Sequence, residues 1–219
     1  YDFLYRVYMK KKDRKNVMKI LSEAIRILPN ATPFRLSYIT RLSELGLNDE
    51  VISNCNDLIE IDPLFTRGYI VLGETYEKLG EKEKSYKNFR KALELEPENV
   101  SLQIKFSEKL LGEQKFQEVL KVYDTLLGFE DVRKNTDLLF KIALFNTKYG
   151  SMAKSGEILA EIVRKKPGGK YYYYYAMILA RLGDRVNALR NMQIALSRYS
   201  GDLTNEQIST AKQTIDALR

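Results

Sequence analysis

The prolines of this chain keep a fixed spacing. Pro29, Pro63 and Pro97 lie 34 residues apart, and Pro167 follows 70 residues after Pro97. The last interval equals one period of 34 and one of 36, so two residues are inserted in the stretch that lacks a phased proline. A constant period of this length indicates one supersecondary unit repeated along the chain. It constrains the fold more than any other feature of the sequence.

Each period contains two stretches with the apolar spacing of amphipathic helices. In residues 66–99, Leu72 and Tyr76 follow this spacing in the first half, and Phe89 and Ala92 follow it in the second. The phased prolines end the second helix, because the residue before a proline avoids the helical conformation. One such hairpin cannot bury its apolar face alone, so neighbouring hairpins must stack on each other.

Residues 66–99 also carry a recognisable order of residue types. The stretch has an aromatic residue, a Leu-Gly pair and a tyrosine, then a turn glycine, two small residues around a phenylalanine, and a proline: Tyr69, Leu72, Gly73, Tyr76, Gly80, Ser85, Phe89, Ala92 and Pro97. This order closely resembles the tetratricopeptide repeat, and weaker copies cover nearly the whole chain. The resemblance implies an all-α, right-handed solenoid of about six helix-turn-helix units plus a C-terminal capping helix, with thirteen helices and no strands.

The register also predicts the domain organisation. We expect an array over residues 1–203, with units at approximately 1–31, 32–65, 66–99, 100–133, 136–168 and 169–202. A capping helix over 204–219 follows, in which Thr204 and Gln207 form a capping box and Ile208, Ala211, Ile215 and Leu218 share one face. The two-residue insertion predicts a subdivision near residue 133, where the stack should bend or loosen.

Five consecutive tyrosines, residues 171–175, go all the way around a helix, so they cannot all face the core. In the tetratricopeptide family the first helices of the units line a concave groove. By that resemblance Tyr172 and Tyr175 occupy core positions and Tyr173 and Tyr174 groove positions, while Tyr171 lies between the two faces. The alternative is that at least three of the five rings simply pack in the core.

The same positions in other units define the candidate groove. Its C-terminal half is apolar and aromatic with lysines among the rings, a pattern typical of an interaction surface. The predicted partner-binding residues are Ile70, Glu74, Ile104, Lys105, Glu108, Phe140, Lys141, Leu144, Lys148, Tyr173, Tyr174 and Met177. Lys105 and Lys141 share one position of adjacent units, so they should lie close together and contact an acidic partner residue, unless they only keep the groove solvated. The sequence thus predicts a non-catalytic scaffold that binds a polypeptide segment.

Other uses of the groove stay open. The chain does not begin with Met and looks like a segment of a longer protein, so a missing segment is one alternative occupant of the groove. Homo-oligomeric assembly through exposed repeat edges is another, because the first unit is incomplete. RNA binding by stacking on Tyr173 and Tyr174 is less favoured, since residues 31–65 are acidic and Glu74 and Glu108 repel phosphate. Some members of the family bind the C-terminal carboxylate of a chaperone through a clamp that needs lysine at the fifth and asparagine at the ninth position of one repeat unit. No unit of this chain has lysine at its fifth position or asparagine at its ninth, so this clamp is not expected.

Composition argues against most catalytic chemistry. The chain has no histidine and a single cysteine, which removes Ser-His and Cys-His pairs, cysteine-rich zinc sites and internal disulfides. Cys55 occupies a core position, so an inert thiol is expected. We expect no enzyme activity, cofactor or metal. No apolar run is long enough for a membrane span, and the sequence favours a soluble protein without deciding between cytoplasm and periplasm.

Charge is distributed unevenly along the chain. The net charge is +7, and residues 1–30 alone carry +5. The basic run over residues 9–19 covers the turn of the first unit. It is interpreted either as a solvated loop or as a contact for an acidic partner or an anionic membrane.

Overall fold

The computed structural model describes residues 1–218, which form fourteen α-helices and one short 3-10 helix and include no strand. The first helices of the hairpins are α1 (Asp2–Lys10), α3 (Thr32–Glu44), α5 (Thr66–Lys78), α7 (Val100–Gly112), α10 (Thr136–Tyr149) and α12 (Gly169–Arg181). Their partners are α2 (Arg14–Ile27), α4 (Asn48–Ile61), α6 (Lys82–Leu95), α8 (Phe116–Leu126), α11 (Met152–Lys165) and α13 (Arg185–Arg198). The remaining helices are α9 (Glu130–Lys134), the 3-10 helix η1 (Ser200–Asp202) and α14 (Asn205–Leu218).

The predicted all-α fold is confirmed, but the expected number of helices is one too small. The additional helix is α9, which forms at the two-residue insertion between the fourth and fifth hairpins. Arg219, the last residue of the predicted capping helix, lies outside the described residues.

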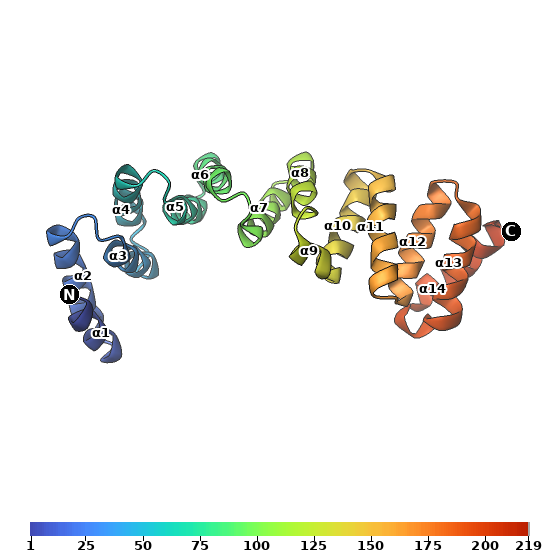
Figure 1. Cartoon of the computed structure of the whole chain (residues 1–219), viewed down its shortest axis with the longest axis horizontal. Helices are drawn as coiled ribbons and strands as arrows, with labels where there is room; N and C mark the ends of the chain where they lie inside the picture. The colour runs from blue at the N-terminus through green and yellow to red at the C-terminus, as the bar shows by residue number, and fades with distance from the viewer. Residues whose placement is uncertain (219) are drawn as a thin grey trace. The chain divides into compact units, whose positions relative to one another are not determined.

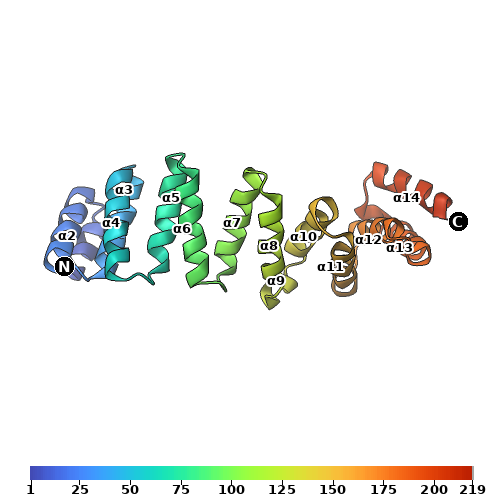
Figure 2. The ribbon, with the colours of Figure 1, turned by 90° about the horizontal axis from the view of Figure 1, so that it is seen from above.

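The chain divides into two compact units, Tyr1–Asn99 and Val100–Arg219. The first contains α1 to α6 and the second contains α7 to α14. Within each unit, short loops place consecutive helices side by side as hairpins (Figures 1 and 2). The division therefore falls between α6 and α7, and the prediction of a subdivision near residue 133 is wrong.

The turns inside the hairpins repeat one backbone conformation. Gly46, Gly80 and Gly183 have φ angles of 74°, 75° and 86° at the turns of the second, third and sixth hairpins. Lys12 and Gln114 take the equivalent places in the first and fourth hairpins, with φ angles of 55° and 57°. A side chain in this left-handed region costs about 1 kcal/mol, which glycine avoids. The residues at positions 12, 46, 80 and 114 thus keep both the 34-residue period and the backbone geometry, although two of them lack the favoured residue type.

The third hairpin shows why its helices require small residues. A Cβ atom added to Gly73 would lie 2.9 Å from the ring of Phe89, so glycine allows α5 and α6 to approach closely. The hydroxyl of Ser85 donates a hydrogen bond of 2.8 Å to the carbonyl oxygen of Gly73. Serine at this position therefore adds a polar link between the two helices where the repeat pattern has alanine.

The predicted burial of Cys55 is confirmed. Its side chain is fully buried among apolar residues of α3, α4 and α5. Burial raises the pKa of the thiol to about 12, against the smaller opposing effect of Arg67. The thiol is therefore protonated at neutral pH and is not a nucleophile.

The insertion is a packed element. Val132 in α9 is buried, and Arg133 Nε donates a hydrogen bond of 2.8 Å to the carbonyl oxygen of Leu127. Arg133 also pairs with Glu161 of α11, and Lys165 Nζ donates to Glu161 Oε1 at 2.6 Å. Burial raises the pKa of Glu161, but the hydrogen bond from Lys165 and the charges of both cations outweigh it, so the net pKa is lowered. The insertion is thus anchored to α11, whereas the sequence predicted a loosened stack.

The capping box before α14 is confirmed. The backbone NH of Gln207 donates to Thr204 Oγ1 at 3.2 Å, and the backbone NH of Thr204 donates to Gln207 Oε1 at 3.0 Å. At the other end of α14, Arg185 Nη2 donates to the carbonyl oxygen of Ala217 at 3.2 Å. Both ends of this helix are therefore held by side-chain hydrogen bonds.

Candidate protein-binding surface

The five tyrosines of α12 divide differently from the predicted pattern. Tyr171 and Tyr173 are buried, with 4% and 8% of their surface exposed. Tyr172, Tyr174 and Tyr175 are half-buried. The expectation that Tyr173 faces an open groove is therefore wrong, whereas Tyr174 keeps an accessible ring.

The C-terminal helix α14 covers Tyr173. The ring packs in one apolar cluster with Ala211 and Ile215. Burial raises the pKa of Tyr173, and the polar side chain of Thr210 opposes the effect only in part. The groove position of the last hairpin is thus occupied by the chain itself.

Met177 lies under the same helix. Its side chain packs against the cluster beneath α14, and Thr214 Oγ1 lies 3.9 Å from its sulfur atom. Met177 and Tyr173 were both predicted to contact a partner. In this structure they contact α14, so neither residue is available to a partner, and both leave the predicted binding set.

Phe140 of α10 links the fifth hairpin to the sixth. Its ring packs edge-to-face against Tyr171 and Tyr174, with ring centroids 5.2 and 5.3 Å apart. Lys170 Nζ lies 5.4 Å from the centroid of Phe140 and 4.8 Å from that of Tyr171. Phe140 and Tyr174 are half-buried, so this group presents aromatic carbon beside a cation. The sequence placed Phe140 here but missed Lys170, which directly precedes the tyrosine run.

One ion pair joins α7 to α10. Lys141 Nζ lies 3.5 Å from Glu108 Oε1, and both side chains are about half exposed. The two residues belong to adjacent hairpins, so the first helices of those hairpins present them to the same surface. The lysine charge offsets part of the negative potential that Glu108 contributes to this surface.

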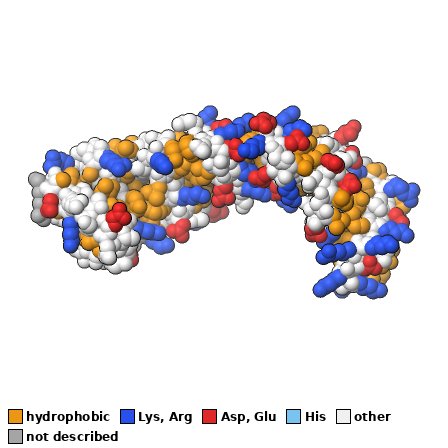
Figure 3. Space-filling view, turned by 180° about the vertical axis from the view of Figure 1, so that it is seen from behind, with side chains coloured by type: hydrophobic (Ala, Val, Ile, Leu, Met, Phe, Trp, Pro, Cys, Tyr) orange, Lys and Arg blue, Asp and Glu red, His pale blue; other side chains and the backbone are white. Residues whose placement is uncertain are grey.

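The other predicted residues are distributed over both units. Ile104, Lys105 and Leu144 are half-buried in the second unit, and Lys148 is exposed with its Nζ 5.0 Å from the centroid of Tyr149. Ile70 and Glu74 are half-buried on α5 in the first unit. Figure 3 shows hydrophobic side chains interspersed with charges of both signs on one face of the molecule.

A second aromatic group was missed by the sequence analysis. Phe116 of α8 stacks on Tyr149 of α10 with a centroid distance of 3.9 Å, and Phe145 lies 4.8 Å from Tyr149. Phe145 also packs edge-to-face on the buried Tyr123 at 5.3 Å. Phe145 and Tyr149 are four residues apart on one helix, a spacing that places both on one face. This group fixes α10 against α8 and thereby positions Phe140, Lys141 and Leu144.

Two other kinds of site are not found in residues 1–218. No group of three or more Cys, Asp or Glu side chains in this range is arranged to hold a metal ion. None of the helices in the described part of the chain combines the length and the apolar character needed to span a bilayer.

The comparison with known families agrees with the repeat register. The family profile described as tetratricopeptide repeat matches residues 66–99, the third hairpin of the structure. Residues 66–99 are therefore a tetratricopeptide repeat. Tetratricopeptide repeats in general mediate protein–protein interactions and are typically non-catalytic.

Several known proteins match parts of the chain. The small glutamine-rich tetratricopeptide repeat-containing protein 2 of Saccharomyces cerevisiae is 28% identical over 93 residues, which cover 42% of this chain and 27% of that protein. Heat shock protein STI1 of the same yeast is 23% identical over 71% of this chain and 26% of its own length. Protein PHOX1 of Arabidopsis thaliana is 26% identical over 71% of this chain and 20% of its own length. The chain thus spans about a fifth to a quarter of these relatives.

Two solved structures share the tetratricopeptide fold. A structure of Naa15/Naa10 bound to HypK-THB superposes with a TM-score of 0.73 at 16% identity, covering 99% of this chain and 34% of that one. YrrB, described as a TPR protein with an unusual peptide-binding site, superposes with a TM-score of 0.58 at 16% identity, covering 88% of this chain and 97% of that one. At this identity the likeness concerns the fold alone.

Proposed function

We propose that this chain is a non-catalytic scaffold that binds a polypeptide segment on the first helices of the second unit. The surface, called here the α7–α10–α12 surface, comprises Ile104, Lys105, Glu108, Phe140, Lys141, Leu144, Lys148 and Tyr174. The half-buried pair of Phe140 and Tyr174 carries the proposal. Aromatic anchors of this kind supply most of the affinity of a protein interface.

Two further observations support this surface. The ion pair between Lys141 and Glu108 and the ring contacts of Phe140 run from α7 through α10 to α12, so the three helices present one continuous row of side chains. Lys170 and Lys148 lie over aromatic rings at the edges of that row, where charged side chains raise association rates more than affinity. The peptide-binding site named for YrrB supports this use of the fold, but it assigns no residue in this chain.

The proposed surface differs from the predicted set in two ways. Tyr173 and Met177 are excluded because α14 covers them. Ile70 and Glu74 belong to the first unit, and their part in binding stays a prediction. The absence of the clamp pattern favours an apolar or mixed segment over the carboxylate tail of a chaperone.

Comparative capture from a lysate of the source cells tests the proposal. Wild type, Phe140→Ala and Tyr174→Ala are used as baits, with Val186→Ala as the matched control, because Val186 is 78% exposed on α13. Specific partners should drop at least about tenfold with both surface variants, since hot-spot truncations cost about 2 kcal/mol or more. Equal capture by all four baits, with unchanged far-UV circular dichroism, would rule out this surface.

Homo-oligomeric assembly is the second candidate, and the exposed side of α1 favours it. Phe3 and Leu4 are 76% and 42% exposed, and α1 contains no buried residue. Light scattering across a concentration series distinguishes this function. A mass that rises with concentration for wild type and stays monomeric for Phe3→Ser/Leu4→Ser supports assembly through α1, and a monomeric wild type excludes it.

A further inference from the structure

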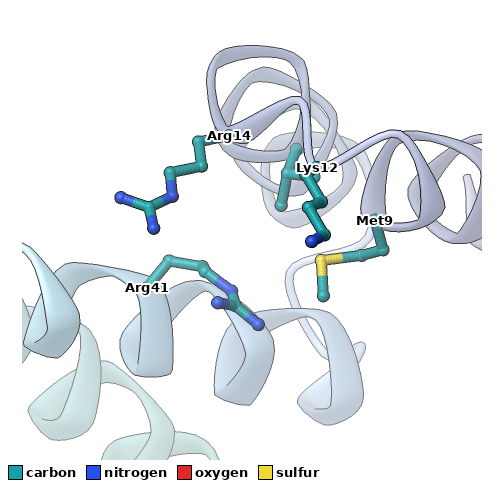
Figure 4. A pocket seen from close by; sticks show the side chains of 5 residues that line it. Met9, Lys12, Arg14 and Arg41 are labelled. Carbon is teal, nitrogen blue, oxygen red and sulfur yellow. The ribbon is translucent and has the colours of Figure 1, made fainter.

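The first unit contains a small pocket between the α1–α2 turn and α3. Met9, Lys12, Arg14, Val17 and Arg41 line it, and its volume is about 210 Å³. Figure 4 shows the head groups of Lys12 and Arg41 reaching toward each other, with the thioether of Met9 beside Lys12 and the head group of Arg14 near the start of the Arg41 side chain. Sites for whole small molecules usually measure about 300 Å³ or more. The pocket therefore suits one side chain or one head group.

Three cations face this space, and one carboxylate offsets them. Arg41 Nη1 pairs with Glu44 Oε2 at 2.6 Å, whereas Arg41 Nε is buried and has no hydrogen-bond partner. Within residues 1–218, neither Lys12 nor Arg14 takes part in a side-chain ion pair. A buried donor without a partner is costly, so the unpaired Nε indicates an acceptor that the protein alone does not supply. Figure 3 shows how densely Lys and Arg side chains cover the N-terminal helices.

The backbone at Lys12 adds an independent observation. Lys12 has a φ angle of 55° at the position where the next two hairpins have Gly46 and Gly80. Strain of this kind is often retained at functional sites. The chain thus gives up the favoured glycine at this turn and gains a cationic side chain in the pocket.

We propose that this pocket binds the phosphorylated side chain of a partner polypeptide. Lys12, Arg14 and Arg41 would donate hydrogen bonds to the phosphoryl oxygens, and Met9 and Val17 would contact the apolar stem. A phosphoryl group carries nearly two negative charges and three acceptor oxygens, which matches three cations better than a single carboxylate does. The site lies in the first unit and is independent of the α7–α10–α12 surface.

Titration with phenyl phosphate, followed through the methyl signals of the five methionines, tests the proposal. The Met9 signal should shift and saturate, while those of Met152, Met177 and Met192 in the second unit stay unchanged. Inorganic phosphate should bind more weakly, and phenol should produce no saturable shift. The proposal would be overturned if the Met9 signal does not shift with phenyl phosphate, or if it shifts equally with phenol.

Two substitutions distinguish the cations from the fold. Arg14→Gln and Arg41→Gln should each weaken phenyl phosphate binding about tenfold or more, because each removes a charge-assisted hydrogen bond. Unchanged affinity in both variants would exclude these arginines as ligands. The last measurement is binding to anionic vesicles in the presence of excess phenyl phosphate. Vesicle binding that phenyl phosphate does not displace would assign the basic surface to membranes and contradict the phosphopeptide proposal.

Lys12→Gly provides the sharpest control, because its two effects have opposite signs. The variant should bind phenyl phosphate several-fold more weakly and yet unfold at a higher temperature, since glycine relieves the backbone strain. Gln114→Gly, at the equivalent turn of the fourth hairpin, should raise the unfolding temperature without changing the Met9 titration. Wild-type affinity in Lys12→Gly would remove Lys12 from the site.

Discussion

The first and last hairpins bury their apolar residues to very different extents. In the first hairpin, α1 contains no buried residue, and Phe3 is 76% exposed. In the last hairpin, Tyr171 and Tyr173 are buried, and α14 lies over Tyr173 and Met177. Both hairpins have the same two-helix design and nearly the same turn geometry. Burial in this array therefore depends on which neighbouring helix covers a face, and a hairpin's own sequence does not decide it.

The largest change in stability is expected when one apolar side chain is removed at each end of the array. Ile215→Ala should lower the free energy of unfolding by about 3 kcal/mol, because it opens a cavity under α14. Phe3→Ala should change it by less than about 0.5 kcal/mol, because that ring is mostly solvated. Urea unfolding followed by circular dichroism measures both. Similar losses in the two variants would show that the first hairpin is covered in solution as well as the last.

A smaller effect is expected where Glu161 anchors α9. Glu161→Gln should cost about 1.5 kcal/mol, since hydrogen bonds from Lys165 and Arg133 lose their charge. The pKa of Glu161 in the folded state lies below its ordinary value of 4.5, so this stability is present above pH 4.5 and is lost as the pH falls through the folded pKa.

Hydrogen exchange across an acid series locates this loss. Protection of α9 and α11 in the second unit should decrease before that of α3 and α4 in the first. Unchanged acid sensitivity in Glu161→Gln would show that this carboxylate does not control the second unit.

The contact between Tyr173 and α14 gives a third prediction. Tyr173→Phe should lower stability by about 1 kcal/mol or less, because the phenol loses its polar interaction with the Thr210 side chain. The pKa of Tyr173 is raised in the folded state, so the unfolded phenol releases its proton first and stability falls as the pH rises above about 10. Thermal unfolding at pH 7 and pH 11 measures both effects. The alkaline loss should shrink in Tyr173→Phe, and an identical loss in wild type and variant would place its origin at other tyrosines.

The smallest expected effect concerns the turn at Gln114. Gln114→Gly should raise stability by about 0.5 kcal/mol, because relief of the left-handed strain exceeds the entropy that glycine adds to the unfolded chain. Differential scanning calorimetry is the measurement. A lower unfolding temperature would mean that the Gln114 side chain contributes more than its backbone conformation costs.

Local patterns predicted most of the secondary structure. The 34-residue period located the hairpins, the turn at Gly80 and the core position of Cys55, and the Thr204–Gln207 pair located the start of α14. These features depend on residues near each other in the sequence. Helix α9 was missed because five residues are too few to show a helical period.

The candidate surface was predicted only in part, for a different reason. The register placed Phe140, Lys141 and Glu108 on the same row of first helices. In the structure Phe140 contacts Tyr174 of the next hairpin, and Lys141 pairs with Glu108 of the preceding one. It placed Tyr173 there too, but the repeat pattern contains no information about the helix that follows the last repeat. The pocket at Lys12 and Arg41 was equally hidden, because its residues come from three helices whose approach depends on packing.

The sequence alone determined the repeat length, the all-α class and the residues that form each hairpin, because helical period and turn chemistry act over a few residues. Only the tertiary structure decided that α14 covers Tyr173, that the units divide between Asn99 and Val100, and that three cations share one pocket. These outcomes depend on contacts between helices far apart in the chain. A periodic sequence repeats the same face in every hairpin, so it cannot specify which of those faces a neighbour will cover.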